Sequence, residues 1–88
     1  MISAKAFMAM TVLERAATVL EHGTELSSRI YMFYVVKLYC LGDFLVELWY
    51  KQNENKIEKI EVVDSEEIFH FYEKKIDISD LFRHKDKI

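Results

Sequence analysis

The hydrophobic pattern near the start of the chain predicts an amphipathic helix from Ala4 to Glu21. Apolar residues recur there at helical spacing, while polar side chains occupy the opposite side. The apolar residues are Ala9, Val12, Leu13, Ala16, Val19 and Leu20. We expect this helix to end at His22-Gly23, because glycine can adopt the left-handed conformation that caps many helices. The following stretch, GTELSS, is polar and is interpreted as a link.

Residues 30–50, IYMFYVVKLYCLGDFLVELWY, predict two strands joined by a hairpin at Gly42-Asp43. The stretch is rich in Val, Tyr and Phe, which favour strands, and Gly-Asp is a strong turn pair. A membrane span is excluded on energetic grounds, because each deeply placed charge, such as Lys37 or Glu47, would cost roughly 2.5–3.5 kcal/mol. The stretch therefore predicts a hairpin inside a folded domain.

The predicted hairpin register has a three-residue turn that pairs Cys40 with Phe44. This register sets apolar side chains opposite one another and Lys37 opposite Glu47. A two-residue turn would instead place Lys37 opposite Leu48. We prefer the first register because it matches apolar with apolar and charge with opposite charge.

A third strand is predicted at Ile57–Val63, which alternates apolar and charged residues. Pairing Glu47 with Lys59 matches the apolar residues of the two neighbouring strands. The result is a Lys37–Glu47–Lys59 charge ladder across three antiparallel strands. Each cross-strand pair contributes only about 0.2–1 kcal/mol, so the ladder would select the register more than it stabilises the fold.

A second helix is predicted after Asp64, which can accept the hydrogen bonds of an N-terminal cap. Acidic residues in the first turn suit the positive end of the helix dipole. The apolar stripe of this helix consists of Ile68, Phe69, Tyr72 and Ile76. Further apolar anchors are expected at Ile78, Leu81 and Phe82.

The predicted fold is a single α+β domain over residues 1–88, with a frayed tail at about 83–88. A helix, a three-stranded antiparallel meander and a second helix follow in order, with both helices on one sheet face. The side chains expected under the helices are Ile30, Met32, Tyr34, Val36, Leu38, Cys40, Phe44, Val46, Leu48, Ile60 and Val62.

The opposite sheet face is expected to be open and apolar around the charge ladder. Its predicted residues are Tyr31, Phe33, Val35, Tyr39, Leu45, Trp49 and Ile57, with Lys37, Glu47 and Lys59 among them. Such a patch would cover roughly 400–700 Å², at or above the largest usual on a soluble monomer. It would be covered by the C-terminal segment, by a second copy of the chain, or by a different protein.

Composition supports a folded domain and excludes some partners. Of the 88 residues 51% are hydrophobic, and the net charge of −3 would not attract phosphate backbones or anionic lipid. Nucleic acid and membranes are therefore not the expected partners. The single cysteine, Cys40, excludes an internal disulfide and suits a reducing compartment, so cytoplasm is the expected location.

No catalytic site, metal site or cofactor is predicted. The three histidines, His22, His70 and His84, lack the spacing that places two metal ligands on one helix face. His70 follows Glu66 by four residues, which indicates a solvated pair. Cys40 lies in an apolar strand and is expected to act as a small buried hydrophobe. An enzyme is therefore not expected.

The helix, three-strand, helix order resembles that of double-stranded RNA-binding domains, and the resemblance covers most of the chain. It implies an RNA-binding surface in which a basic cluster opens the second helix. The matching positions here are Asp64, Ser65, Glu66 and Glu67, which would repel phosphates.

The sequence thus predicts a small non-catalytic protein–protein interaction module, forming a homodimer or binding another protein through the aromatic sheet face. Two alternatives remain open. One is a nucleic-acid-binding module, because aromatic side chains on an open sheet can stack on bases. The other is an acidic inhibitor of another protein, of the antitoxin or immunity type.

Overall fold

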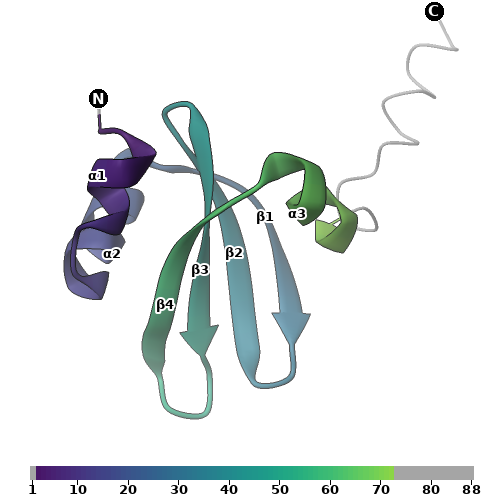
Figure 1. The fold of residues 1–88 in the computed structure, drawn as a ribbon. Coiled ribbons are helices and arrows are strands. Elements are labelled where there is room, and N and C mark those ends of the chain that lie inside the picture. The colour runs from purple at the N-terminus through teal and green to yellow at the C-terminus, as the bar shows by residue number, and fades with distance from the viewer. Residues whose placement is uncertain (1, 73–88) are drawn as a thin grey trace, which may run out of the picture.

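The computed structural model describes residues 2–72, which form a four-stranded antiparallel sheet with helices on both faces (Figure 1). The elements in chain order are α1 (Ala4–Met8), α2 (Val12–His22), β1 (Thr24–Tyr31), β2 (Tyr34–Leu41), β3 (Phe44–Lys51), β4 (Lys56–Val63) and α3 (Ser65–Tyr72). Neighbouring strands in the sheet are also neighbours in sequence. The predicted α+β class and antiparallel sheet are confirmed, but the strand count of three was wrong.

The additional strand is β1, which occupies the stretch interpreted as a polar link. It lies at a sheet edge and is largely exposed, so it lacks the alternation of a half-buried strand. The chain then turns at Met32 and Phe33, and Met32 has a positive φ of 54°. Residues 30–41 are therefore two strands and a turn, where one strand had been predicted.

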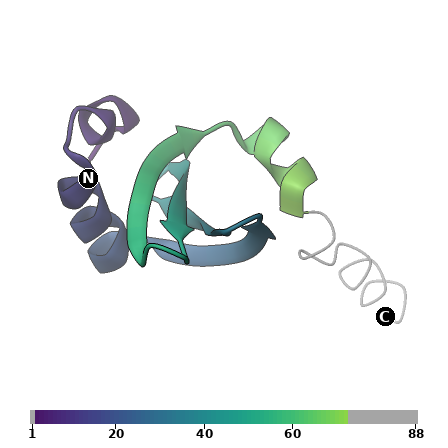
Figure 2. The ribbon, with the colours of Figure 1, turned by 90° about the horizontal axis from the view of Figure 1, so that it is seen from below.

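The helices lie on opposite faces of the sheet, whereas both had been predicted on one face (Figure 2). Helices α1 and α2 pack on one face, here called the α2 face. Helix α3 packs on the other, the α3 face. Apolar side chains on both faces must be removed from water, and on the α3 face these include Leu38 and Val63. Each face is therefore covered by a helix.

The β2–β3 hairpin has the two-residue turn that the charge-matching argument had rejected. Leu41 pairs with Phe44, and Leu38 lies opposite Glu47. Gly42, the first turn residue, has a φ of 65°, a conformation that glycine adopts without steric cost. The predicted register was therefore wrong by one residue, because the turn outweighed weak cross-strand charge pairs.

The predicted N-terminal helix is divided into α1 and α2 by a capping box at Thr11 and Glu14. The Glu14 amide donates to Thr11 Oγ1 at 3.1 Å, and the Thr11 amide donates to Glu14 Oε1 at 2.9 Å. These hydrogen bonds lower the pKa of Glu14. Ala16 and Val19 are buried as predicted, whereas the other four residues of the predicted apolar side, Ala9, Val12, Leu13 and Leu20, are exposed.

Gly23 ends α2 with a φ of −81°, so the predicted left-handed cap was wrong. Glycine is required there for lack of space, because a Cβ atom would lie 2.6 Å from the carbonyl oxygen of Val19. The predicted cap of α3 is confirmed, since the Glu66 amide donates to Asp64 Oδ1 at 2.8 Å.

The protein has a larger core on the α2 face and a smaller one on the α3 face. The buried residues of the larger core are Phe7, Ala16, Val19, Tyr39, Leu41, Val46, Leu48 and Ile60. The smaller core consists of Leu38, Ile68 and Tyr72. Within residues 2–72, no helix is long and apolar enough to cross a membrane. The predictions for Ile76, Ile78, Leu81, Phe82, His84 and the tail at 83–88 lie outside the described residues.

Candidate interaction surfaces

The predicted contact residues do not share one face. Those on the α3 face are Tyr31, Leu45, Glu47, Trp49 and Lys59. Those on the α2 face are Val35, Lys37, Tyr39 and Ile57. Phe33 lies in the β1–β2 turn. A one-residue shift of the β2–β3 pairing moves every side chain of β3 to the opposite face relative to β2. This shift explains why the predicted contact residues are divided between the two faces.

The predicted Lys37–Glu47–Lys59 ladder does not form. Lys37 lies opposite Leu48, and its Nζ is 3.2 Å from Glu25 of β1. The Nζ atom of Lys59 lies 3.8 Å from Oε1 of Glu61, which is on the same strand. The pairs of both lysines are partly exposed, so we expect each to stabilise the fold by less than about 1 kcal/mol.

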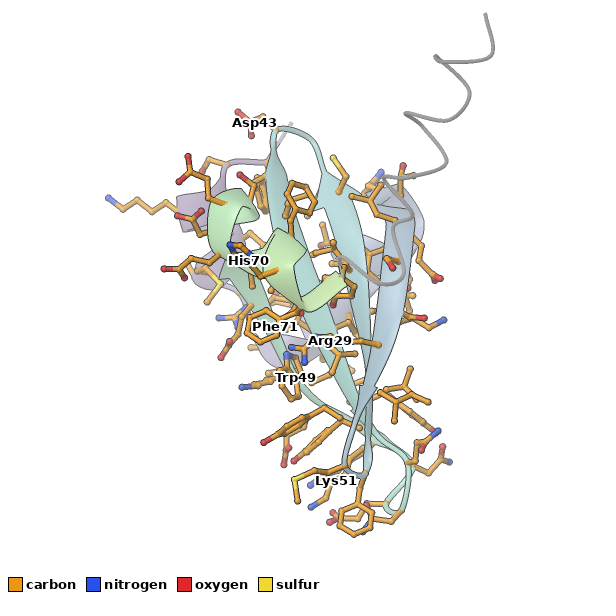
Figure 3. All side chains as sticks on the ribbon, turned by 90° about the vertical axis from the view of Figure 1, so that its right-hand side faces the viewer. Arg29, Asp43, Trp49, Lys51, His70 and Phe71 are labelled. Atoms are coloured by element: carbon orange, nitrogen blue, oxygen red, sulfur yellow. The ribbon has the colours of Figure 1, made fainter. Side chains whose placement is uncertain are left out.

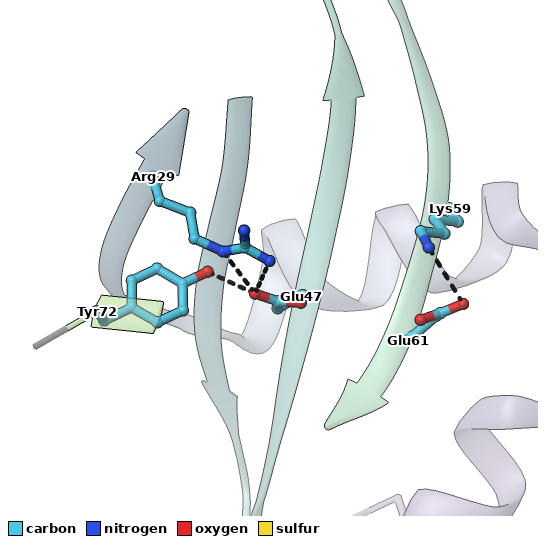
Figure 4. A network of polar contacts seen from close by, with 5 residues as sticks. All are labelled: Arg29, Glu47, Lys59, Glu61 and Tyr72. Carbon is cyan, nitrogen blue, oxygen red and sulfur yellow. Dashed lines mark hydrogen bonds and ion pairs between the residues drawn. The ribbon is translucent and has the colours of Figure 1, made fainter. Parts of the chain in front are cut away.

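Glu47 is instead buried in a polar network on the α3 face, with 3% of its surface exposed (Figure 4). Its Oε2 atom accepts a hydrogen bond from the Tyr72 hydroxyl at 2.7 Å and two from Arg29, from Nη2 at 3.2 Å and from Nε at 3.3 Å. Burial, followed by the bond to Glu47, raises the pKa of Tyr72. The network connects β1, β3 and α3.

Aromatic rings surround the Arg29 guanidinium (Figure 3). Its central carbon lies 4.7 Å from the ring centre of Phe71, 5.2 Å from that of Trp49 and 5.7 Å from that of Tyr72. The sequence interpretation missed this role, because Arg29 falls just after the supposed polar link. Trp49 therefore packs against a paired cation, and part of its surface is buried within the domain.

The α2 face carries an apolar groove of about 430 Å³ beside α2. Its lining residues come from α2, β2, β3 and β4: Leu20, Val35, Lys37, Tyr39, Leu48, Tyr50 and Ile57. All four predicted contact residues on this face line the groove. Burial within the domain raises the pKa of Tyr39, as does nearby Glu25.

The tip of the β1–β2 hairpin is strongly apolar. Ile30, Tyr31, Met32 and Phe33 expose 71%, 50%, 72% and 59% of their surfaces. Ile30 pairs with Val35, which lines the groove. Since paired residues share a face, Ile30 connects the tip with the groove on the α2 face, whereas Tyr31 lies on the α3 face with its ring centre 6.1 Å from that of Trp49.

Both edge strands of the sheet carry a β-bulge. The register skips Leu26 in β1 and Glu58 in β4. Bulges twist an edge strand and interrupt its row of backbone hydrogen-bonding groups, which discourages the addition of a further strand. Association through side chains on a sheet face is therefore favoured over edge-to-edge pairing.

His22, His70 and Cys40 lie apart from this groove. The Nε2 atom of His22 lies 3.8 Å from Oε2 of Glu21, and both side chains are largely exposed. His22 also lines a cavity of about 670 Å³ with Met10, Thr18 and Leu41. Cys40 is partly exposed, and His70 lies on α3 (Figure 3). Within residues 2–72, no group of three or more His, Cys, Asp or Glu side chains could hold a metal ion.

Comparison of the chain with protein-family models, curated proteins and solved structures found no match. The observed order also departs from the helix, three-strand, helix order that resembles double-stranded RNA-binding domains. Strand β1 is additional, and α3 lies on the face opposite α2. The functional interpretation therefore depends on the groove, the hairpin tip and the charges around them.

Proposed function

We propose that the protein is a small, non-catalytic protein–protein interaction module that forms a homodimer. The observation that carries this proposal is the run of four large, exposed apolar side chains at residues 30–33. Together they present on the order of 400–500 Å² of apolar surface, near the upper limit for a soluble monomer. Burial against another protein surface would remove this area from water.

The charge distribution favours a protein partner over nucleic acid. Arg29 and Lys59, the two cations nearest Trp49, are each paired with a carboxylate. Phosphate binding would have to compete with these pairs, and the net charge of −3 adds repulsion. The single Cys40 is consistent with a reducing compartment such as the cytoplasm.

Sedimentation velocity of the full chain over a range of concentrations tests the proposal. We expect a monomer–dimer equilibrium that Phe33→Glu weakens at least about tenfold, because the substitution would place a charge among the apolar side chains of the hairpin tip. Phe69→Glu is the matched control, because Phe69 is similarly exposed but lies on α3. A wild type that is monomeric at every concentration would contradict homodimer formation.

Binding to RNA or single-stranded DNA, measured by fluorescence anisotropy at low salt, addresses the alternative class. We expect no saturable binding. A nucleic-acid affinity that falls steeply with salt would replace the proposed function with nucleic-acid recognition. A monomer without nucleic-acid affinity would instead favour the acidic inhibitor of another protein.

A further inference from the structure

Helix α2 has a second apolar side that faces solvent. Leu13 and Leu20 expose 82% and 64% of their surfaces, and Ala17 between them is also exposed. The spacing of i, i+4 and i+7 places these residues in one stripe, here called the leucine ridge. Ala16 and Val19, by contrast, face the core. An amphipathic helix that only covered a sheet would not need this second stripe.

The leucine ridge lies directly beside the groove, because Leu20 belongs to both. One continuous surface therefore contains a protrusion and a recess. A two-fold symmetric dimer needs such a self-complementary surface, since each copy contributes the same patch. The ridge of one copy can enter the groove of the other while its own groove receives the partner's ridge.

The charges around this surface also complement one another. Glu14 and Glu21 directly follow Leu13 and Leu20 in sequence, so both lie on the same flank of the ridge, and both are exposed. Lys37 lines the groove, and its ammonium group, 3.2 Å from Glu25, stays partly exposed. Carboxylates of a second copy would share this partly exposed ammonium group with Glu25, even though the whole chain is acidic.

The available apolar area is comparable to the smallest area that a specific contact buries. Leu13, Leu20 and Ile30 are mostly exposed, and Val35, Tyr50 and Ile57 are partly exposed. If fully buried, they would contribute roughly 450–600 Å² per copy, or about 900–1,200 Å² for two. Biological interfaces generally exceed about 1,000 Å² in total.

We infer that a second copy of this chain docks on the α2 face, with the leucine ridge of each protomer in the groove of the other. This inference rests on the proposed function as a self-associating module and specifies its contact. The bulged edge strands agree with it, because the two sheets would meet through helices and side chains rather than along an edge.

Substitution of the ridge tests the inference. Leu13→Gln and Leu20→Gln keep good helix formers in α2 and remove apolar groups that are already in water, so both variants should fold. By sedimentation velocity, we expect each to raise the dimer dissociation constant at least about tenfold and the double variant about a hundredfold. Far-UV circular dichroism of each variant should match the wild type.

Phe69→Gln is the control, because it removes an exposed apolar side chain from α3. We expect its dissociation constant to equal that of the wild type. A wild-type dimer that the ridge variants leave intact would overturn the inference but not the proposed function. A dimer lost only in Phe69→Gln would overturn it in favour of the α3 face. A monomeric wild type would overturn both proposals.

Discussion

Glu47 is a buried carboxylate that connects two strands and a helix. Arg29 supplies the opposite charge and Tyr72 a hydrogen bond, which together offset part of the cost of removing the carboxylate from water. Sequence alone placed Glu47 on an open face, because its partners are 18 and 25 residues away in the chain. No local pattern indicates such distant contacts.

Replacement of Arg29 by Met should destabilise the fold by about 3–5 kcal/mol, because Glu47 would stay buried without its cation. The double variant Arg29→Met/Glu47→Leu should recover most of this loss, since an apolar pair replaces the ion pair. Urea unfolding measures both effects. A loss below about 1 kcal/mol in the single variant would show that the pair behaves like a surface pair.

Tyr72 makes the free energy of unfolding depend on pH in the alkaline range. Its pKa is raised in the folded state, whereas an unfolded tyrosine ionises near pH 10. Tyr72 therefore contributes stability fully below about pH 10 and loses that contribution as the pH rises further. At pH 8, Tyr72→Phe should be less stable than the wild type by about 1.5–3 kcal/mol, because a hydrogen bond to a charged group usually contributes that much to stability.

Urea unfolding of both proteins between about pH 8 and pH 11 checks this dependence. The stability difference should narrow toward the alkaline end, because only the wild type loses the contribution of Tyr72. Other groups that titrate in this range affect both proteins equally. A difference that stayed constant with pH would contradict the raised pKa.

At the scale of elements, sequence patterns predicted β2, β3, β4 and the start of α3, because these segments have clear alternation or capping residues. They missed β1, whose polar residues lie at a sheet edge and bury little. They also missed the break before α2, although Thr11 and Glu14 have the spacing of a capping box. The apolar periodicity continues through this break, so the pattern predicted one helix instead of two.

The α2–β1 junction depends on the absence of a side chain at Gly23. Gly23→Ala should cost about 1–3 kcal/mol, because its Cβ would approach the Val19 carbonyl oxygen and force the backbone apart. Thermal and urea unfolding measure this loss. Ala6→Gly in α1 is a useful comparison, since glycine at an exposed helix position costs only about 1 kcal/mol through helix propensity. An unchanged stability in Gly23→Ala would mean that the junction can relax.

In the molecule as a whole, the sheet separates two cores. The turns that join β1 to β2 and β3 to β4 extend beyond the helices at one end of the sheet (Figure 1). This arrangement leaves the groove and the hairpin tip uncovered by the described residues. Alternation within β2 correctly grouped Val35, Lys37 and Tyr39 on one face. The one-residue register error then assigned Trp49 and Glu47 to that face as well. The leucine ridge was missed because its periodicity resembles that of a core-facing stripe.

A dilution series of the full chain, followed by amide chemical shifts, shows directly whether and where a second copy docks. Amide shifts that change with concentration should belong to α2 around Leu13 and Leu20, to the groove around Val35, Tyr50 and Ile57, and to the hairpin tip around Phe33. Amides of α3 and of Arg29 should stay constant. Concentration-dependent shifts confined to α3 and the Trp49 region, or none at any concentration, would contradict docking on the α2 face.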